Sequence, residues 1–228
     1  MKTIKILHLY YDLLNMYGEN GNMRALVKKL EQENINVSVI FKSIEDTYDL
    51  SLYDFIYIGT GTDENYKLAL ADVQKNKDQF IKAIANKQFI LVTGNALDLF
   101  SDAKILNFTS KQVDFRIIGE QVFATNLISE KIIGFQNRNR VISSSQEEYL
   151  FEVITGTGYN PDAKEEGIHH LNFYGTYLLG PILIRNPYFL DYLIKELLIS
   201  KSYPYQELPE TIAYQAYHEF LKNFVNPK

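Results

Sequence analysis

The sequence predicts an α/β domain with a mainly parallel sheet and an antiparallel extension. Three observations favour this fold class. Short apolar runs alternate with amphipathic helical patterns in the first half of the chain, β-rich runs follow one another in the middle, and helical patterns return near the end. Alternation of strand and helix at this spacing is typical of parallel strands joined by crossover helices.

The first half of the chain supplies the predicted parallel strands and their helices. Apolar or alternating runs predict strands at Ile4–Tyr10, Ile35–Phe41, Asp54–Ile58 and Phe89–Val92. Apolar residues at helical spacing predict helices over Arg24–Glu33, Asp63–Asn86 and Ala96–Phe100. Between the first strand and the first helix, glycines break the pattern and predict a loop over Asp12–Asn22.

The second half changes in texture from about residue 104 onward. Short β-rich runs predict the antiparallel extension at Phe115–Ile118, Gln121–Ala124, Lys131–Phe135 and Tyr149–Ile154. A late strand and two helices are predicted at Phe173–Leu178, Tyr188–Ser200 and Pro209–Phe224. Pro187 suits the first turn of the first of these helices, where a missing N–H costs nothing. No repeat or linker interrupts the chain, so residues 1–228 are assigned to a single domain.

Composition excludes several classes of function. A net charge of -5 leaves no excess of Lys and Arg to neutralise a phosphate backbone, which argues against nucleic-acid binding. The absence of cysteine excludes thiol catalysis, disulfides and thiolate metal sites. No apolar run approaches the ~20 residues that span a bilayer, and the N-terminus lacks a secretory h-region. We therefore expect a cytoplasmic protein without a membrane span.

Four stretches in a consistent order carry a family resemblance. They are Leu9–Leu26 with its Tyr-Gly and Gly-Asn landmarks, Ile58-Gly-Thr-Gly-Thr-Asp63, Gly134-Phe-Gln-Asn137, and Gly156–Pro187. Together they resemble class I glutamine amidotransferases of the cobyric acid synthase-like group, and in particular the small glutaminase subunit of lipid II isoglutaminyl synthase. The resemblance implies a flavodoxin-like class I glutamine amidotransferase domain.

The two central catalytic positions of that family are altered here. The chemistry needs a cysteine thiolate on a sharp strand-to-helix turn, a histidine that moves protons, and two backbone N–H groups around the developing oxyanion. The resemblance places the nucleophile at Thr93, in Phe89-Ile-Leu-Val-Thr-Gly-Asn95, and the histidine at Leu179. It therefore implies a glutaminase scaffold without glutaminase chemistry.

The remaining pocket positions are partly retained. The resemblance places the oxyanion and substrate pocket at Gly59, Gly61, Gly94 and Arg116. From the residues alone, Gly59-Thr-Gly61 is either a structural turn or an anion site, and Arg116 is either a solvated strand residue or a pocket residue.

Residues around these positions have also changed. Leu97, Gln136 and Arg138 stand where the family pattern has Gln, Glu and His. Asn95 tolerates a left-handed conformation, so we expect the strand-to-helix turn itself to survive.

A threonine nucleophile would need an adjacent base. His169 and His170 would lie on the order of 30 Å from Leu179 if the intervening segment were extended. His8 is the remaining candidate, and we interpret it as a hydrogen-bonded core residue. The carboxylates Asp162, Glu165 and Glu166 lack a supporting metal ligand, so neither a metal nor a cofactor is expected.

The sequence therefore leads to one favoured function and two alternatives. The resemblance implies a catalytically degenerate subunit that forms a heterodimer with a Mur-ligase-like synthetase in peptidoglycan precursor (lipid II) amidation. One alternative is an active glutaminase that uses Thr93 as its nucleophile. The other is a sensor or scaffold module that binds glutamine or a small carboxylate in the old pocket.

Overall fold

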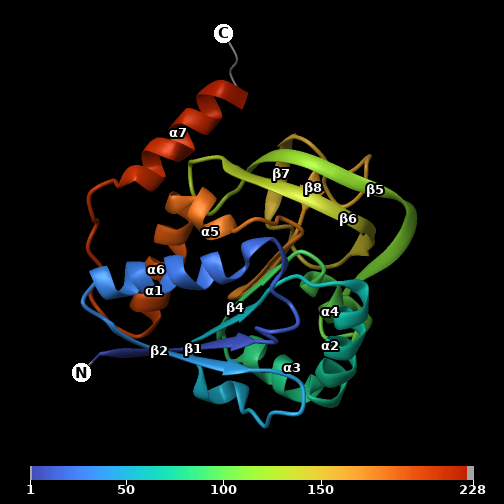
Figure 1. Ribbon diagram of the computed structural model, residues 1–228, viewed down its shortest axis with the longest axis horizontal. Helices are drawn as coiled ribbons and strands as arrows, with labels where there is room; N and C mark the ends of the chain where they lie inside the picture. Colours follow the sequence, from blue (N-terminus) through green and yellow to red (C-terminus); the bar gives the residue numbers. More distant parts are fainter. Residues whose placement is uncertain (1, 225–228) are drawn as a thin grey trace.

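The computed structural model describes residues 2–224, which form two β-sheets (Figure 1). The larger sheet has the strand order β2-β1-β3-β4-β10-β9, and the smaller has the order β6-β5-β7-β8. All strands of the larger sheet pair in parallel except β9, which runs antiparallel to β10, and the smaller sheet is antiparallel throughout. The predicted fold class is confirmed, and the antiparallel extension is a sheet of its own.

The strands agree closely with the sequence pattern. Those of the larger sheet are β1 (Thr3–Leu9), β2 (Asn36–Lys42), β3 (Phe55–Ile58), β4 (Phe89–Thr93), β9 (Ile168–His170) and β10 (Phe173–Thr176). Those of the smaller sheet are β5 (Phe108–Ala124), β6 (Ile132–Ser145), β7 (Phe151–Thr155) and β8 (Glu165–Glu166). The two runs predicted at Phe115–Ile118 and Gln121–Ala124 are one long strand, because an irregular register between Gln112 and Ile117 interrupts the alternation.

The helices before α7 lie on both faces of the larger sheet. In chain order, the helices are α1 (Asn20–Gln32), α2 (Asp63–Lys75), α3 (Lys77–Ala85), α4 (Ala96–Asp102), α5 (Ile182–Arg185), α6 (Pro187–Ser200) and α7 (Ile212–Phe224), with 3-10 turns η1 (Met16–Gly18) and η2 (Leu50–Leu52). The helix predicted over Asp63–Asn86 is two helices, since Asn76 leaves helical geometry at φ −102° and ψ 12°. Part of the loop predicted over Asp12–Asn22 is helical, and Pro187 opens α6 as expected.

Two hydrophobic clusters hold the helices against the sheet. In β3 and β4, consecutive side chains belong to opposite clusters: Ile56 and Ile90 pack toward α2, α3 and α4, whereas Tyr57 and Leu91 pack toward α1 and α6. Central parallel strands that are buried on both faces read as continuous apolar runs, which is why these strands were visible in the sequence. Figure 1 shows α1 and α6 on one side of the sheet and α2 and α4 on the other.

The last helix packs on the smaller sheet. Tyr217 of α7 is buried with Val122 of β5 and Ile133 of β6, and its hydroxyl donates a 2.8 Å hydrogen bond to the carbonyl of Lys131. The predicted helix at Pro209–Phe224 therefore exists but begins at Ile212. No helix within residues 2–224 has the length and apolar character needed to cross a bilayer.

Candidate functional site

The strand-to-helix turn at the end of β4, which we call the elbow, bends sharply at Gly94, one residue after Thr93. Gly94 adopts a left-handed conformation with φ +60°. A Cβ atom built there would lie 2.5 Å from Cβ of Thr60 and 2.6 Å from Cδ2 of Leu179, so only glycine fits. Asn95 has φ −71° and ψ −8° and is therefore not left-handed. The left-handed residue of the turn is Gly94.

The side chain of Thr93 is enclosed by the protein. It is fully buried, and its hydroxyl donates a 2.6 Å hydrogen bond to Oε2 of Glu19 while lying 3.0 Å from the Tyr57 hydroxyl. Gly94 and Asn95 line the adjacent cavity, whereas Thr93 does not. The hydroxyl therefore belongs to an internal network on the α1 side of the sheet.

Glu19 is the centre of that network and was not identified from the sequence. Its Oε2 accepts hydrogen bonds from Thr93, Tyr57 and Asn22, and the carboxyl group is fully buried. Burial raises the pKa of Glu19 to about 7, although these hydrogen bonds oppose the shift. Asn22 also accepts a 2.9 Å bond from the backbone N–H of Leu183. The Leu9–Leu26 segment is thus fixed to β3, β4 and α5.

The backbone donors expected to form an oxyanion hole are occupied from within. The N–H of Gly94 donates to the carbonyl of Thr176 at 2.9 Å, continuing the β4–β10 ladder. The N–H of Gly61 donates to Oδ1 of Asn95 at 3.0 Å, and Nδ2 of Asn95 donates to the carbonyl of Gly61 at 2.8 Å.

Asn95 also exchanges hydrogen bonds with Thr60, since the Thr60 hydroxyl donates to its Oδ1 at 2.8 Å and accepts from its backbone N–H at 3.2 Å. We call these contacts of Asn95 with Thr60 and Gly61 the Asn95 clamp. Gly59 has no space for a side chain, because a Cβ there would lie 2.5 Å from the Leu14 carbonyl. Gly59-Thr-Gly61 is therefore a tightly packed turn.

Leu179 lies beside the elbow. Its side chain is buried over Gly94, and its backbone N–H donates to the carbonyl of Phe135 at 2.8 Å. The structure thus brings Leu179 and the Thr93–Gly94 turn together at the carboxyl edge of the sheet. An aliphatic side chain at this place can neither accept nor donate a proton.

The histidines do not replace the missing base. His8 is fully buried, as expected, but neither of its ring nitrogens has a hydrogen-bond partner among the described residues, so the prediction of a hydrogen-bonded histidine was wrong. Its ring packs 5.2 Å from that of Tyr57, and burial lowers its pKa to about 4.

The other two strand histidines lie at the far end of β10. Because β9 runs back along β10, His170 pairs with Phe173 and His169 with Tyr174, whereas Thr176 at the other end of β10 pairs with Thr93. The segment is folded and not extended as assumed from the sequence, but it still keeps both histidines away from the elbow.

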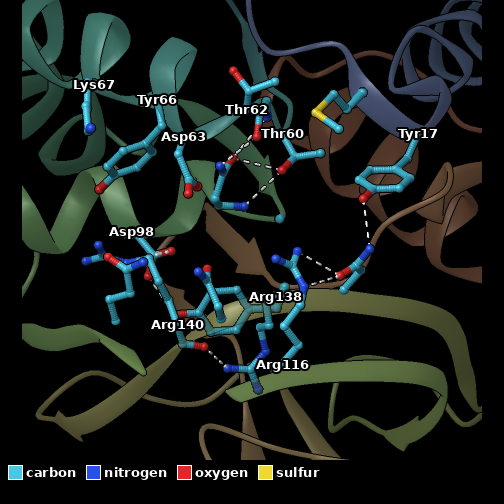
Figure 2. Close-up of a pocket in the computed structure, with 18 residues that line it drawn as sticks. Tyr17, Thr60, Thr62, Asp63, Tyr66, Lys67, Asp98, Arg116, Arg138 and Arg140 are labelled. Carbon is cyan, nitrogen blue, oxygen red and sulfur yellow. Dashed lines mark hydrogen bonds and ion pairs between the residues drawn. The ribbon is translucent and has the colours of Figure 1, made fainter. Parts of the chain in front are cut away.

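A cavity of about 420 Å³ opens beside the elbow (Figure 2). Figure 2 shows Thr62, Tyr66 and Lys67 on one wall and three arginines from the β5–β6 ribbon on the other. Arg116 is exposed, as expected of a strand arginine, and also lines the cavity. It donates to Oδ1 of Asn137 at 3.0 and 3.2 Å, and Asn137 donates to the Tyr17 hydroxyl at 3.0 Å.

Arg138 and Gln136, which depart from the family pattern, form a buried structural network. The Arg138 guanidinium lies 4.1 Å from the centre of the Tyr177 ring and donates to Oε1 of Gln136 at 3.1 Å and to the carbonyls of Arg140, Gly158 and Tyr159. Nε2 of Gln136 in turn donates a 3.4 Å hydrogen bond to Oε1 of Glu166. Burial raises the pKa of Glu166 to about 7.

Ion pairs neutralise Arg140 on the cavity wall, so the other cations in the lining set the charge of the cavity. Its guanidinium pairs with Asp98 at 3.2 Å and Asp102 at 2.9 Å. Lys67 and Arg116 also line the cavity and have no carboxylate partner among residues 2–224. Arg138 lines the cavity without an ion pair as well, and Asp63 is the one lining carboxylate without an ion pair among the described residues, so an anionic group there would meet a net positive field.

The described residues contain no metal centre. Within residues 2–224 no group of three His, Asp or Glu side chains converges on a point that could hold an ion. Glu166, one of the three carboxylates that the sequence brought together, is fully buried and accepts hydrogen bonds from Thr176 and from the backbone of Tyr177.

Two bacterial proteins are similar to this chain over most of its length. It is 29% identical over 197 residues to the GatD subunit of lipid II isoglutaminyl synthase (glutamine-hydrolyzing) from Streptococcus pneumoniae, covering 80% of this chain and 76% of that protein. It is also 29% identical over 223 residues to the GatD subunit from Staphylococcus aureus, covering 90% of this chain and 89% of that protein. No protein-family profile matches the chain.

Solved structures agree on the fold. PurLQS from Thermotoga maritima superposes with a TM-score of 0.60 at 14% identity, covering 97% of this chain and 100% of that chain. A glutamine amidotransferase from the same organism has a TM-score of 0.55 at 10% identity, covering 95% and 89%. The chain is thus a homologue of GatD subunits with the fold of class I glutamine amidotransferases.

Proposed function

From the similarity to GatD subunits, we propose that this protein is a catalytically degenerate amidotransferase-like subunit. Its partner would be a Mur-ligase-like synthetase that amidates the peptidoglycan precursor lipid II, and its place would be the cytoplasm. The two relatives carry a lipid II isoglutaminyl synthase name, and the alignments extend over most of both chains. The proposal transfers the pathway from those relatives but not their glutamine hydrolysis.

The proposed loss of hydrolysis rests on one observation: the side chain at the nucleophile position and the backbone N–H groups at the oxyanion positions are all engaged within the protein. Thr93 is buried away from the cavity, Leu179 covers Gly94, and the N–H groups of Gly94 and Gly61 are already bonded within the protein. Glutamine hydrolysis requires an accessible nucleophile, a proton carrier and donors that point at the oxyanion. None of the three is available on the cavity side, because Thr93 and its neighbour Glu19 lie outside the cavity lining and the two N–H groups are bonded within the protein.

An active threonine enzyme is the competing proposal, and one contact favours it. The Thr93 hydroxyl donates to Glu19, whose pKa is raised to about 7, so a base adjacent to the hydroxyl exists. The same contact directs the hydroxyl away from the cavity, and both residues are fully buried. We therefore favour a structural role for the pair.

The cavity supports a second function, the binding of a small carboxylate without its hydrolysis. Lys67 and Arg116 line it without carboxylate partners, and Arg116 is held by Asn137 in a position to receive an anion. Glutamine, glutamate and similar ligands offer the carboxylate that such a pair would bind. Calorimetric titration of the isolated protein with glutamine and with glutamate tests this role, and Arg116→Gln should abolish the heat of any specific binding.

The partner proposal is tested by co-expression with a Mur-ligase-like synthetase from the same cell. We expect co-elution as one heterodimer in size-exclusion chromatography with light scattering, and higher synthetase activity in the complex than alone. Separate elution at micromolar concentrations, with unchanged synthetase activity, would contradict the proposal and leave the carboxylate-binding function as the better one.

A further inference from the structure

A second cavity, of about 580 Å³, lies between the loop that joins β5 to β6, helix α6, and the segment that leads into α7. It shares no lining residue with the cavity beside the elbow. Neither the proposed partner nor the proposed carboxylate ligand accounts for its composition. We call it the tyrosine cleft.

Aromatic rings form the walls of the tyrosine cleft. The four tyrosines that line it are Tyr188, Tyr192, Tyr205 and Tyr214. The rings of Tyr188 and Tyr214 stand nearly perpendicular, with centroids 5.0 Å apart. The face of a tyrosine ring carries partial negative charge, so walls of this kind attract cations.

Carboxylates add to this negative character. Four of them line the cleft against one basic residue, Lys195; they are Glu130, Asp191, Glu207 and Glu210. Asp191 pairs with Lys29, and Glu210 accepts a 2.6 Å hydrogen bond from Tyr188. Glu207 is exposed and has no side-chain partner among residues 2–224, so its charge is available to a ligand.

Nearby carboxylates contribute to raised pKa values of two tyrosines in the cleft. The pKa of Tyr188 is raised to about 12, mainly by its hydrogen bond to Glu210. The pKa of Tyr205 is also raised to about 12, first by burial and then by the charges of Asp191, Glu33 and Glu207. A cation in the cleft would be stabilised by the same field.

The chain itself already places ammonium groups on two of these rings. Nζ of Lys195 lies 6.0 Å from the centre of the Tyr205 ring, and Nζ of Lys29 lies 5.8 Å from that of Tyr214. These contacts show that rings of this cleft bind charged head groups at the distance that cation–π contacts require. Within residues 2–224 no such contact involves the rings of Tyr188 and Tyr192, which leaves them for a ligand.

The lining selects among possible cations. The carboxylates do not converge on one point, because no group of three acidic or histidine ligands within residues 2–224 could hold a metal ion. Apolar side chains from Leu127, Ile128 and Leu208 lie beside the rings. A charged head on a long methylene stem, flanked by other residues, matches this combination of charge and apolar surface.

We propose that the tyrosine cleft binds a lysine or arginine side chain presented by another polypeptide. The negative lining and the ring faces receive the charged head, and the apolar residues receive its stem and neighbours. This docking site is independent of the elbow and of the cavity beside it, so it stands whether or not the proposed function is correct.

The test is an NMR titration of the full chain with ¹³C-labelled tyrosine. The probes are a capped Leu-Arg-Leu tripeptide, the same tripeptide with neutral citrulline in place of arginine, and agmatine as a small free cation. We expect saturable shifts at Tyr205 and Tyr188 with the arginine peptide, and an affinity about tenfold weaker for the citrulline peptide. Equal affinities for the two peptides, or no saturable shift, would overturn the proposal.

Two variants localise the effect. Glu207→Gln should weaken the arginine peptide severalfold, and Tyr205→Leu should do so as well, whereas Glu219→Gln on the exposed side of α7 should leave its affinity unchanged. Retained tyrosine chemical-shift dispersion shows that each variant is folded. Equal loss in Glu207→Gln and Glu219→Gln would place binding outside the cleft. Agmatine binding as tightly as the peptide would assign the cleft to free amines and overturn the polypeptide partner.

Discussion

At the scale of single residues, polar side chains around the elbow are bonded to one another within the fold. Thr93 and Tyr57 are bonded to Glu19, and Asn95 is bonded to the Gly59–Gly61 turn. In a working hydrolase such groups would be directed at substrate. Here they satisfy one another inside the protein, as buried polar groups must when no ligand or water does so.

The Asn95 clamp makes a prediction about restoring hydrolysis. The variant Thr93→Cys with Leu179→His should release only a trace of ammonia from glutamine, because the side chain at position 93 is buried toward Glu19 and Asn95 still occupies the N–H of Gly61. Adding Asn95→Gly frees that donor, and one oxyanion donor is worth about 10²–10³ in rate. We expect at least about tenfold more ammonia from the triple variant in a coupled glutaminase assay.

The matched control for this experiment is Thr93→Cys with Asn95→Gly, which has the freed donor but no histidine. It should remain as inactive as the double variant. Circular dichroism should show that all three variants fold. If the double variant were as fast as the triple one, the clamp would have no role in the loss of hydrolysis.

Glu19 makes a prediction about pH. Its pKa is raised from an ordinary 4.5 to about 7, so between these values the unfolded chain has lost a proton that the folded protein retains. The contribution of Glu19 to the free energy of unfolding is therefore fully present below pH 4.5 and decreases as the pH rises toward 7, by about 1–3 kcal/mol.

Urea unfolding of the parent and of Glu19→Gln at pH 4.5, 6 and 7.5 measures this contribution as a difference. The variant should gain stability relative to the parent as the pH rises. Glu31→Gln removes an exposed carboxylate from α1 and should show no such trend. A pH-independent difference between the parent and Glu19→Gln would contradict the pKa shift and with it the buried network.

At the scale of elements, the elbow depends on the exact fit between β4, α4 and the segment after β10. Gly94 combines a left-handed φ with contact against Thr60 and Leu179, whereas Gly180 has a similar φ of +70° and nothing within 4 Å. Substitutions at these two glycines therefore distinguish the cost of the left-handed backbone from the cost of a steric conflict. This pairing exists only because the turn after β3 and the chain after β10 meet over the end of β4.

We predict that Gly180→Ala costs about 1 kcal/mol of stability, from the left-handed conformation alone. Gly94→Ala should cost at least about 2 kcal/mol more, because the added methyl group must displace Thr60 or Leu179. Thermal and urea unfolding of both variants measure the difference. Equal costs would mean that the contact seen at Gly94 relaxes freely.

At the scale of the whole molecule, charge is unevenly distributed. Lys67 and Arg116 line the cavity beside the elbow. In the tyrosine cleft, four of the five charged lining residues are carboxylates. A chain with a net charge of -5 thus presents two local fields of opposite sign. Two distinct partners or ligands can be selected by these fields without competing with one another.

The proposed heterodimer makes a prediction about the nitrogen source. If this subunit is degenerate as proposed, amidation of lipid II by the complex should depend on added ammonium and should not be supported by glutamine alone. Mass spectrometry of the lipid product with ¹⁵N-ammonium or with amide-¹⁵N glutamine distinguishes the two sources. Incorporation from glutamine that Thr93→Val abolishes would instead identify an active threonine enzyme.

The sequence alone determined the alternation of strands and helices in the first half of the chain, the absence of a thiol, and the identity of Thr93 and Leu179, but it did not predict β8, β9 or α5. These features follow from local periodicity, composition and family resemblance, none of which depends on long-range contacts. The central strands were evident because burial on both faces makes them continuously apolar. The break between α2 and α3 at Asn76 and the continuity of β5 were not evident from the sequence, because a short break or an irregular register leaves no strong periodic signal.

Only the tertiary structure decided what the polar residues do. Glu19 lies far from Thr93 along the chain, and Asn95 far from Gly61, so no local pattern reveals that they are bonded. The same holds for His8, whose unpaired ring nitrogens face aromatic neighbours on β2, on β3 and in the turn after β1. Hydrogen bonding and burial are properties of packed surfaces. The family resemblance could single out Thr93 and Leu179, but only the fold showed that Thr93 is enclosed and that the N–H groups of Gly61 and Gly94 are bonded within the protein.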